Sequence, residues 1–206
     1  MKVTRLKPQR RNSRRYSVFL DGTYSFSLDQ ETIIALGLKP GIDLEPADVE
    51  HITHEEKLRR AKDYALLLLS YRARTVKELC DRLKRKKFEP DIIDAAINRL
   101  KELKLLDDNK FARDYVEDRI KLRHKGKWVV RGELLKLGIS KEQIEQALAQ
   151  APDELEPAQE LVHKYRSRHA GLEPEVRKRR LYALLARRGF SPDTIREALK
   201  LPENRA

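Results

Sequence analysis

Three stretches of the chain carry the same pattern of apolar residues and decide the fold. They read LCDRLKRKKFEPDIIDAAI at residues 79–97, VRGELLKLGISKEQIEQAL at residues 130–148 and LYALLARRGFSPDTIREAL at residues 181–199. Each stretch starts 51 residues after the one before it. A fixed period of this size is typical of an array of stacked supersecondary units. Six columns recur in register, which predicts helix–helix core: Leu79, Val130, Leu181; Leu83, Leu134, Leu185; Phe88, Ile139, Phe190; Ile93, Ile144, Ile195; Ala96, Ala147, Ala198; Ile97, Leu148, Leu199.

Each unit contains three helical patterns, which we name helices A, B and C in chain order. In the first unit we expect helix A over about 57–72, helix B over about 76–87 and helix C from Pro90 to near Leu105. The run from Thr75 to Glu78 has the spacing of a capping box, and proline favours the first helical position. Lys87 stands where the other units have glycine, so we expect this helix B to end differently. The other units offer equivalent signals at Asp108, Gly126, Gly138, Ser140, Pro157, Gly171, Pro174, Gly189 and Ser191.

The residues before the first unit have a β pattern. Apolar residues alternate over 16–20 and again over 24–28, and Asp21-Gly22 between them is a strong hairpin signal. Residues 3–7 offer a third strand, and Asp29 offers a cap for a short helix that ends at Gly37. Residues 41–56 hold six acidic residues and no basic one, which we interpret as a linker leading to the first unit.

The predicted fold is therefore mainly α: an elongated, curved array of three tandem three-helix repeats after a small β-hairpin-containing segment. We place the N-terminal segment at 1–56 and the repeats at 57–106, 107–152 and 153–206.

Composition narrows the class of protein. The 206 residues include 45 Lys and Arg against 33 Asp and Glu, which gives a net charge of +12 and favours a polyanionic partner or an acidic protein surface. The single cysteine, Cys80, fits a reducing compartment, and no apolar run reaches the roughly 18 residues of a membrane span. We expect a cytoplasmic protein, a monomer, with no membrane association.

The basic residues follow the repeat. No acidic residue occurs over 119–131 or 177–188, whereas 140–160 hold six acidic residues and one lysine. We therefore predict a basic face along the B helices that binds a partner or DNA. The candidate residues are Arg72, Arg74, Arg82, Lys84, Arg85, Arg119, Lys121, Arg123, Lys125, Lys127, Arg131, Arg177, Arg180, Arg187 and Arg188.

The sequence contains no strong catalytic motif. The chain has no phosphate-binding loop, no dinucleotide fingerprint and no zinc-protease motif. Asp91 and Glu102 mimic the spacing of a metal-dependent nuclease, but eleven residues on one helix separate them by roughly 16 Å. His51 and His54 lie among acidic residues, where a charged linker explains them better than a metal site. Cys80 is expected to be a buried structural thiol. We predict no catalytic residue, metal or cofactor.

Two further patterns bear on DNA. Helices B and C resemble a helix-turn-helix, but acidic residues at the start of each helix C argue against operator binding. Tyr115 and Trp128 lie near the basic stretch of the second unit and would be able to stack on bases. Burial between helices is the commoner fate of such rings, and we expect it here.

The middle unit resembles the bacterial regulatory RecX family. The residues that carry the resemblance are the run LLDDNKFARDY at 105–115, Arg119, Lys125-Gly126, Glu133-Leu134 and Leu137-Gly138-Ile139, with a weaker likeness over 184–191. The resemblance covers about 57–200 and leaves the β-containing first 55 residues outside the core pattern. It implies a non-enzymatic regulator that binds the filament of the recombinase RecA on single-stranded DNA, lies along its helical groove and lowers its ATPase, strand-exchange and coprotease activities.

The alternative is a general DNA-binding protein whose basic face is its whole function, in which case binding to naked DNA falls steeply with salt. A nuclease is the third reading.

Overall fold

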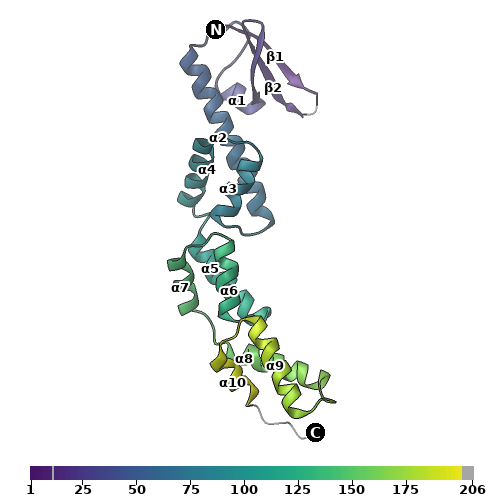
Figure 1. Ribbon diagram of the computed structural model, residues 1–206. Coiled ribbons are helices and arrows are strands. Elements are labelled where there is room, and N and C mark those ends of the chain that lie inside the picture. Colours follow the sequence, from purple (N-terminus) through teal and green to yellow (C-terminus); the bar gives the residue numbers. More distant parts are fainter. Residues whose placement is uncertain (11, 201–206) are drawn as a thin grey trace. The chain divides into compact units, whose positions relative to one another are not determined.

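The computed structural model describes residues 1–10 and 12–200 (Figure 1). Contacts divide the chain into two compact units: Met1–Leu67 with Leu83–Arg99, and Leu68–Arg82 with everything from Leu100 onward. Within the described residues, a small sheet and one short helix precede nine helices arranged as three triplets. The mainly α fold with three three-helix repeats is thus confirmed.

The N-terminal sheet has three antiparallel strands in the order β1 (Val3–Gln9), β2 (Asn12–Leu20) and β3 (Thr23–Asp29). The predicted hairpin joins β2 to β3, and both turn residues have positive φ, 48° at Asp21 and 83° at Gly22. Leu20 pairs with Thr23, so the loop has only these two residues. The third strand predicted over 3–7 pairs with β2.

One face of this sheet is covered by α1 (Gln30–Ala35) and the start of the next helix. The helix α1 ends as predicted, because Gly37 adopts φ 61°. The expected cap is wrong in detail: Asp29 precedes α1 but its carboxylate does not bond the helix, since Arg15 and Arg59 occupy it. The buried core of this part is formed by Val3, Val18, Leu20, Phe26, Leu28, Ile33, Leu38, Leu44 and Ile52.

The first helix of the first triplet is longer than expected. The helix α2 spans Pro46–Tyr71, so most of the acidic stretch that we took for a linker is helical. Pro46 suits the first position, and the Asp48 carboxylate accepts a 3.0 Å hydrogen bond from the Glu45 main-chain N–H. Acidic side chains in the first turns also interact favourably with the helix dipole. Composition suggested a linker here because residues 41–56 hold six acidic residues and no basic one.

The remaining helices follow the 51-residue period. They are α3 (Val76–Arg85) and α4 (Pro90–Glu102); α5 (Asp108–Glu117), continued by a π-helical turn η1 (Asp118–Leu122), α6 (Lys127–Lys136) and α7 (Lys141–Ala149); then α8 (Leu155–Arg168), α9 (Pro174–Arg188) and α10 (Pro192–Leu199). All six predicted apolar columns are buried except at Phe88 and Leu199, which are half-buried.

The predicted caps are mostly confirmed. Thr75 and Glu78 bond each other's main-chain N–H, and Ser140 forms the same box with Gln143. At α5 the prediction is wrong by one residue: Asp107 caps the helix, while the Asp108 carboxylate accepts from the main-chain N–H of Val76 at 3.0 Å.

The helix that lacks a terminal glycine ends like the other two. Lys87 adopts φ 61°, in the same left-handed region as Gly138 and Gly189 at 87°. The Phe88 N–H reaches the Leu83 carbonyl as its counterparts do in the other repeats. The expected difference is therefore wrong: the backbone conformation is kept at the cost of a strained lysine, because the tertiary fold requires the turn.

The repeats of the second unit join through their B helices. The 51-residue period relates Thr75 to Gly126 and Leu137 to Arg188. Thr75 Oγ1 donates to the Leu137 carbonyl at 2.7 Å, and the Gly126 N–H donates to the Arg188 carbonyl at 2.9 Å. At both joints the start of one B helix therefore caps the end of the next, and the helix dipoles align head to tail.

A carboxylate completes each joint, half-buried at Asp108 and buried at Glu154. The first residue of α3 donates its N–H to Asp108, and the first residue of α6, Lys127, donates its N–H to Glu154. Glu154 is one of the few buried charged residues among those described. Gly126 and Gly189 lie backbone to backbone: a Cβ on Gly126 would fall 2.1 Å from the Gly189 carbonyl carbon.

Replacing Lys87 by glycine should raise the free energy of unfolding by roughly 0.5–1 kcal/mol, because the left-handed strain disappears and only part of the gain is lost to the entropy of the unfolded chain. Urea unfolding followed by circular dichroism measures it. Lys87→Ala is the control, since it removes the charge and keeps the strain. Equal stability of the two variants would contradict the strain at Lys87.

Gly126→Ala should destabilise the second unit by more than about 2 kcal/mol, because the new methyl group meets main-chain atoms that cannot move aside. Gly132→Ala in the same helix has open space around it and should be neutral or stabilising by about 0.5–1 kcal/mol. Thermal unfolding of the two variants provides the comparison, and similar melting temperatures would show that the joint is open in solution.

Candidate functional site

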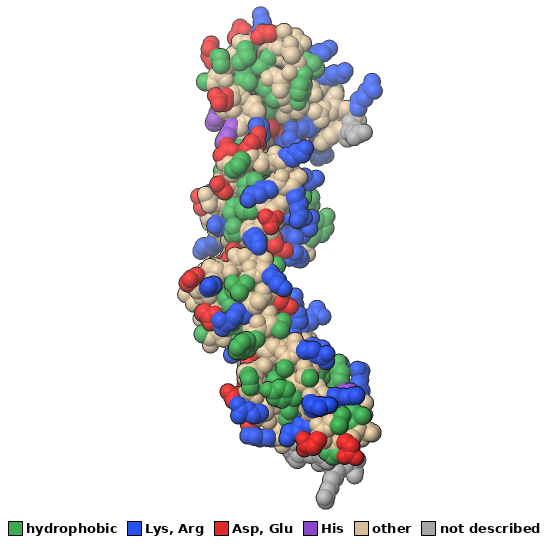
Figure 2. Space-filling model, viewed as in Figure 1, with side chains coloured by type: hydrophobic (Ala, Val, Ile, Leu, Met, Phe, Trp, Pro, Cys, Tyr) green, Lys and Arg blue, Asp and Glu red, His purple; other side chains and the backbone are tan. Residues whose placement is uncertain are grey.

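The predicted basic residues divide into those that the fold uses and those that it leaves to solvent. Lys and Arg side chains stand on the surface of every part of the chain in Figure 2, interspersed with Asp and Glu. Arg72 pairs with Glu78, Lys121 with Glu117 at 2.7 Å, and Arg131 with Glu145. Surface pairs of this kind add little stability, but they lower the charge offered to a partner.

Arg119 and Lys125 form part of a network inside the second repeat. Both contact the Glu133 carboxylate, which also accepts a 3.1 Å hydrogen bond from the Tyr115 hydroxyl. Burial opposes ionisation of Glu133, but the hydrogen bonds from Lys125 and Tyr115 outweigh it and lower the pKa of this carboxyl. Burial raises the pKa of Tyr115, whose ring lies 4.3 Å below the Arg119 guanidinium. Arg119 and Lys125, which were predicted to bind a partner, therefore stabilise the packing of helices within their own repeat.

Arg123, Lys127 and Trp128 lie in one cluster at the joint between α6 and α9, where Arg123 and Trp128 are exposed and Lys127 is half-buried. Neither cationic side chain forms an ion pair among the described residues, although the charge of Lys127 interacts with that of Glu154. The Trp128 side chain is 73% exposed, so the expectation that it is buried is wrong. The main-chain N–H of Trp128 donates to the Gly189 carbonyl, and the joint thereby fixes the start of α6 while the indole faces solvent. Tyr115, by contrast, is half-buried, so the expected burial is met only in part.

The other predicted residues lie on the ends and flanks of the B helices. Arg74 donates to the Leu68 carbonyl, and Arg188 to the Arg123 carbonyl at 2.9 Å. Arg177 is half-buried and has an interaction within the protein. Exposed side chains without an ion pair in the described part of the chain are Arg82, Lys84, Arg85, Arg180 and Arg187. Each repeat thus retains free cations, although fewer than the sequence suggests.

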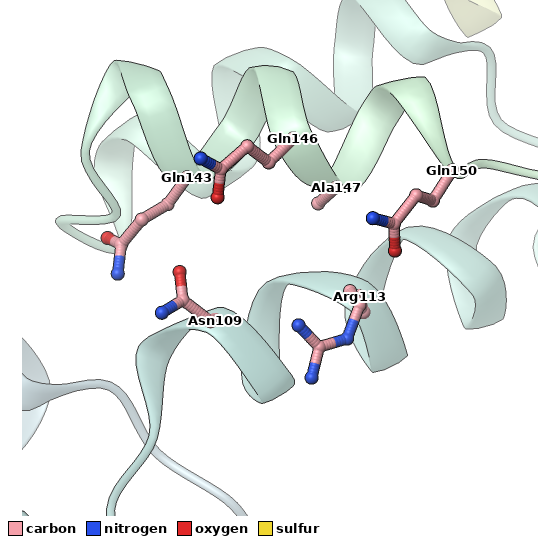
Figure 3. Close-up of a pocket in the computed structure, with 6 residues that line it drawn as sticks. All are labelled: Asn109, Arg113, Gln143, Gln146, Ala147 and Gln150. Atoms are coloured by element: carbon pink, nitrogen blue, oxygen red, sulfur yellow. The ribbon is translucent and has the colours of Figure 1, made fainter.

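A groove between α5 and α7 was missed by sequence reasoning. It is lined by Asn109 and Arg113 from α5 and by Gln143, Gln146 and Gln150 on or just after α7, with Ala147 at its floor. The polar side chains face one another across it in Figure 3. The signal in the sequence was the concentration of three of the chain's six glutamines within 143–150. Such uncharged side chains form hydrogen bonds that salt screens little.

The residues considered for metal or nucleophile chemistry do not assemble. Among the described residues, no three His, Cys, Asp or Glu side chains are placed to hold a metal ion. Asp91 and Glu102 lie at opposite ends of α4, and His54 meets Asp91 at 3.8 Å while His51 is exposed. Cys80 is half-buried, so its expected full burial is wrong. None of the helices in the described chain has the length and apolarity that crossing a membrane requires.

Four family models match consecutive parts of the chain. The regulatory protein RecX N-terminal domain matches residues 1–45, and the first, second and third RecX three-helix domains match 61–100, 107–148 and 152–199. The chain belongs to the RecX family. The match at 1–45 corrects the expectation that the β-containing segment lies outside the family pattern.

Relatives and solved structures agree with this RecX assignment. The regulatory protein RecX of Bacillus subtilis is 34% identical over 199 residues, which cover 96% of this chain and 75% of the relative. The regulatory protein RecX of Bacillus pumilus is 35% identical over 204 residues, which cover 96% of this chain and 76% of the relative. A crystal structure of a regulatory protein RecX has a TM-score of 0.73 at 26% identity and covers 97% of this chain and 99% of its own. The crystal structure of RecX from Lactobacillus salivarius has a TM-score of 0.66 at 29% identity, and the match covers 70% of this chain and 96% of the Lactobacillus chain. The chain is therefore a RecX-type regulatory protein.

The carboxylates at the RecX joints are held in an unfavourable environment. Burial raises the pKa of both Asp108 and Glu154, and the hydrogen bonds from the main chain offset only part of this effect. Each carboxylate still accepts a main-chain N–H that would otherwise be buried without a partner. An uncharged acceptor would satisfy the same donor at a lower desolvation cost.

Glu154→Gln should therefore retain the joint, while Glu154→Ala should be less stable than Glu154→Gln by about 1–3 kcal/mol, because the Lys127 N–H loses its acceptor. The pKa of Glu154 is raised in the folded state, so its contribution to stability is complete below the unfolded value of about 4.3 and is lost as the pH rises through the raised value. The wild type should thus lose stability relative to Glu154→Gln over the range that starts at about pH 4.3, the unfolded-state value, and extends upward. Urea unfolding across this range tests it, and a constant difference would refute the raised pKa.

Proposed function

We propose that this protein binds the RecA–single-stranded DNA filament along its helical groove and lowers its ATPase, strand-exchange and coprotease activities without catalysis of its own. The observation that carries the proposal is the succession of four RecX domains, each of the three repeats bearing cations that the fold leaves unpaired. Contacts spread over tandem repeats give avidity without a deep pocket. A helical polymer of repeated subunits offers several such contacts in succession.

The direct test is the single-stranded-DNA-dependent ATPase of preformed RecA filaments, titrated with this protein. We expect inhibition at well below one molecule per RecA subunit, because one bound molecule covers or blocks several subunits. An ATPase that remains unchanged at micromolar protein would refute the proposal. Inhibition that begins only when the protein exceeds the DNA binding sites would instead favour simple competition for DNA.

The cluster at the joint identifies the cations to change. The double variant Arg123→Glu with Lys127→Glu should weaken filament binding at least tenfold, because two unpaired cations become anions near a polyanion. The matched control is Lys141→Glu with Lys164→Glu, which makes the same charge change at exposed positions outside the predicted basic face. Equal loss in both variants would mean that only net charge matters. Arg119 and Arg131 are poor test positions, because they pair with Glu133 and Glu145.

Direct binding to DNA is the second candidate function, and the exposure of Trp128 beside unpaired cations favours it. Trp128 is the only tryptophan, so its fluorescence reports on this cluster alone. Base stacking would quench it on addition of a thymidine oligonucleotide, and a steep loss of binding with salt would mark the phosphate contacts. Unchanged fluorescence with tight DNA binding would place the DNA elsewhere.

A further inference from the structure

The first unit contains a cleft that the proposed function does not use. It has a volume of about 350 Å³, within the range of small-molecule sites. Its walls come from three parts of the unit: Asn12, Arg15 and Asp29 from the sheet, Arg60, Asp63 and Tyr64 from α2, and Lys86 and Phe88 from the end of α3 and the turn after it.

The acidic side chains that line the cleft, Asp29 and Asp63, both pair with arginines. Arg15 lies 2.8 Å from the buried Glu56 carboxylate and 3.2 Å from Asp29, and it donates to the Ser27 carbonyl. Arg59 contacts Asp29 and Glu56, and it lies 2.8 Å from Asp63. The two guanidinium groups thus share three carboxylates and form a fixed wall.

Two cations of the cleft remain without a carboxylate. Arg60 and Lys86 are exposed, and neither pairs with an acidic side chain among the described residues. Adding them to the wall of two guanidiniums and three carboxylates makes the cleft net positive. The Lys86 ammonium lies over the Tyr64 ring, 5.3 Å from its centre, so this cation covers one face of the ring. An anionic group bound to Lys86 would therefore lie next to an aromatic side chain.

The uncharged lining points to the rest of the ligand. Tyr64 and Phe88 are both half-buried, each with part of its ring accessible. Aromatic rings of this kind stack on nucleobases. The Asn12 amide oxygen already accepts a hydrogen bond from the Arg14 main-chain N–H, and the amide NH2 group remains as a donor for a base edge. Inorganic phosphate would contact only the cations, whereas a nucleoside phosphate would contact both the cations and the aromatic rings.

We infer that the cleft between the N-terminal sheet, α2 and the end of α3 binds a nucleoside phosphate, with its phosphate on Arg60 and Lys86 and its base against Tyr64 and Phe88. The ligand has two possible sources, a free nucleotide or the phosphorylated terminal nucleotide of a DNA strand. The inference is independent of any action on RecA, because it concerns residues outside the cluster at the α6–α9 joint.

Isothermal titration calorimetry of the full chain tests the inference, with thymidine 5′-monophosphate, thymidine and inorganic phosphate as probes. We expect the monophosphate to bind more tightly than either part alone. Arg60→Glu and Lys86→Glu should each weaken it roughly tenfold or more, and Tyr64→Leu should remove its advantage over inorganic phosphate. Lys62→Glu is the control, because it lies on α2 between lining residues but does not itself line the cleft.

Three results would overturn the inference: no binding of the monophosphate at millimolar concentration, equal binding of inorganic phosphate by the wild type, or binding that Arg60→Glu and Lys86→Glu leave unchanged. Circular dichroism of each variant shows that a loss of binding is not a loss of folding. A thymidine decanucleotide with and without a 5′-phosphate separates the two sources. Preference for the phosphorylated strand over the free monophosphate assigns the cleft to a DNA end, and the opposite preference assigns it to a free nucleotide.

Discussion

The joint between successive B helices constrains the second unit more than any other contact. The first N–H groups of a helix and its last carbonyls have no partners within the helix. Here the start of α3 satisfies carbonyls at the end of α6, and the start of α6 satisfies those of α9. Each connection also uses a side-chain acceptor from the next repeat, the carboxylate of Asp108 or of Glu154. The repeats are thus linked by their backbones as well as by apolar side chains.

The same joints determine which lysines and arginines form bonds within the fold and which remain available to a partner. Lysines and arginines near the joints serve the fold when they reach a carbonyl or Glu133, as Lys77, Arg119 and Arg188 do. Others form no ion pair within the described part of the chain, as with Arg123 and Lys127. The same physical requirement that builds the array therefore leaves a smaller set of charges for a polyanion, and it holds the Trp128 backbone while its ring remains in solvent.

The repeat, its helices and most caps could be predicted because they follow from apolar periodicity and local main-chain chemistry. The hairpin at Asp21-Gly22 is such a case, since two positive φ angles demand these residues. The start of α2 was missed although its signals, Pro46 and Asp48, are local. The burial of Glu154 and the exposure of Trp128 could not be predicted, because each depends on a residue far away in sequence. Lys87 is the clearest example: local preference indicates a different ending, and tertiary packing imposes the left-handed turn. For the same reason the sequence marked the basic residues but not which of them are already paired.

The backbone pairing at Gly126 also changes how the molecule exchanges hydrogen with water. Amide protons in the first turn of a helix normally exchange fast, because they bond only to solvent. At the start of α6, the protons on Gly126, Lys127 and Trp128 are all bonded to α9 or to Glu154, which precedes α8. Their exchange therefore requires the neighbouring repeat to move away. The exchange rates of these three adjacent amides thus report how often the two repeats separate.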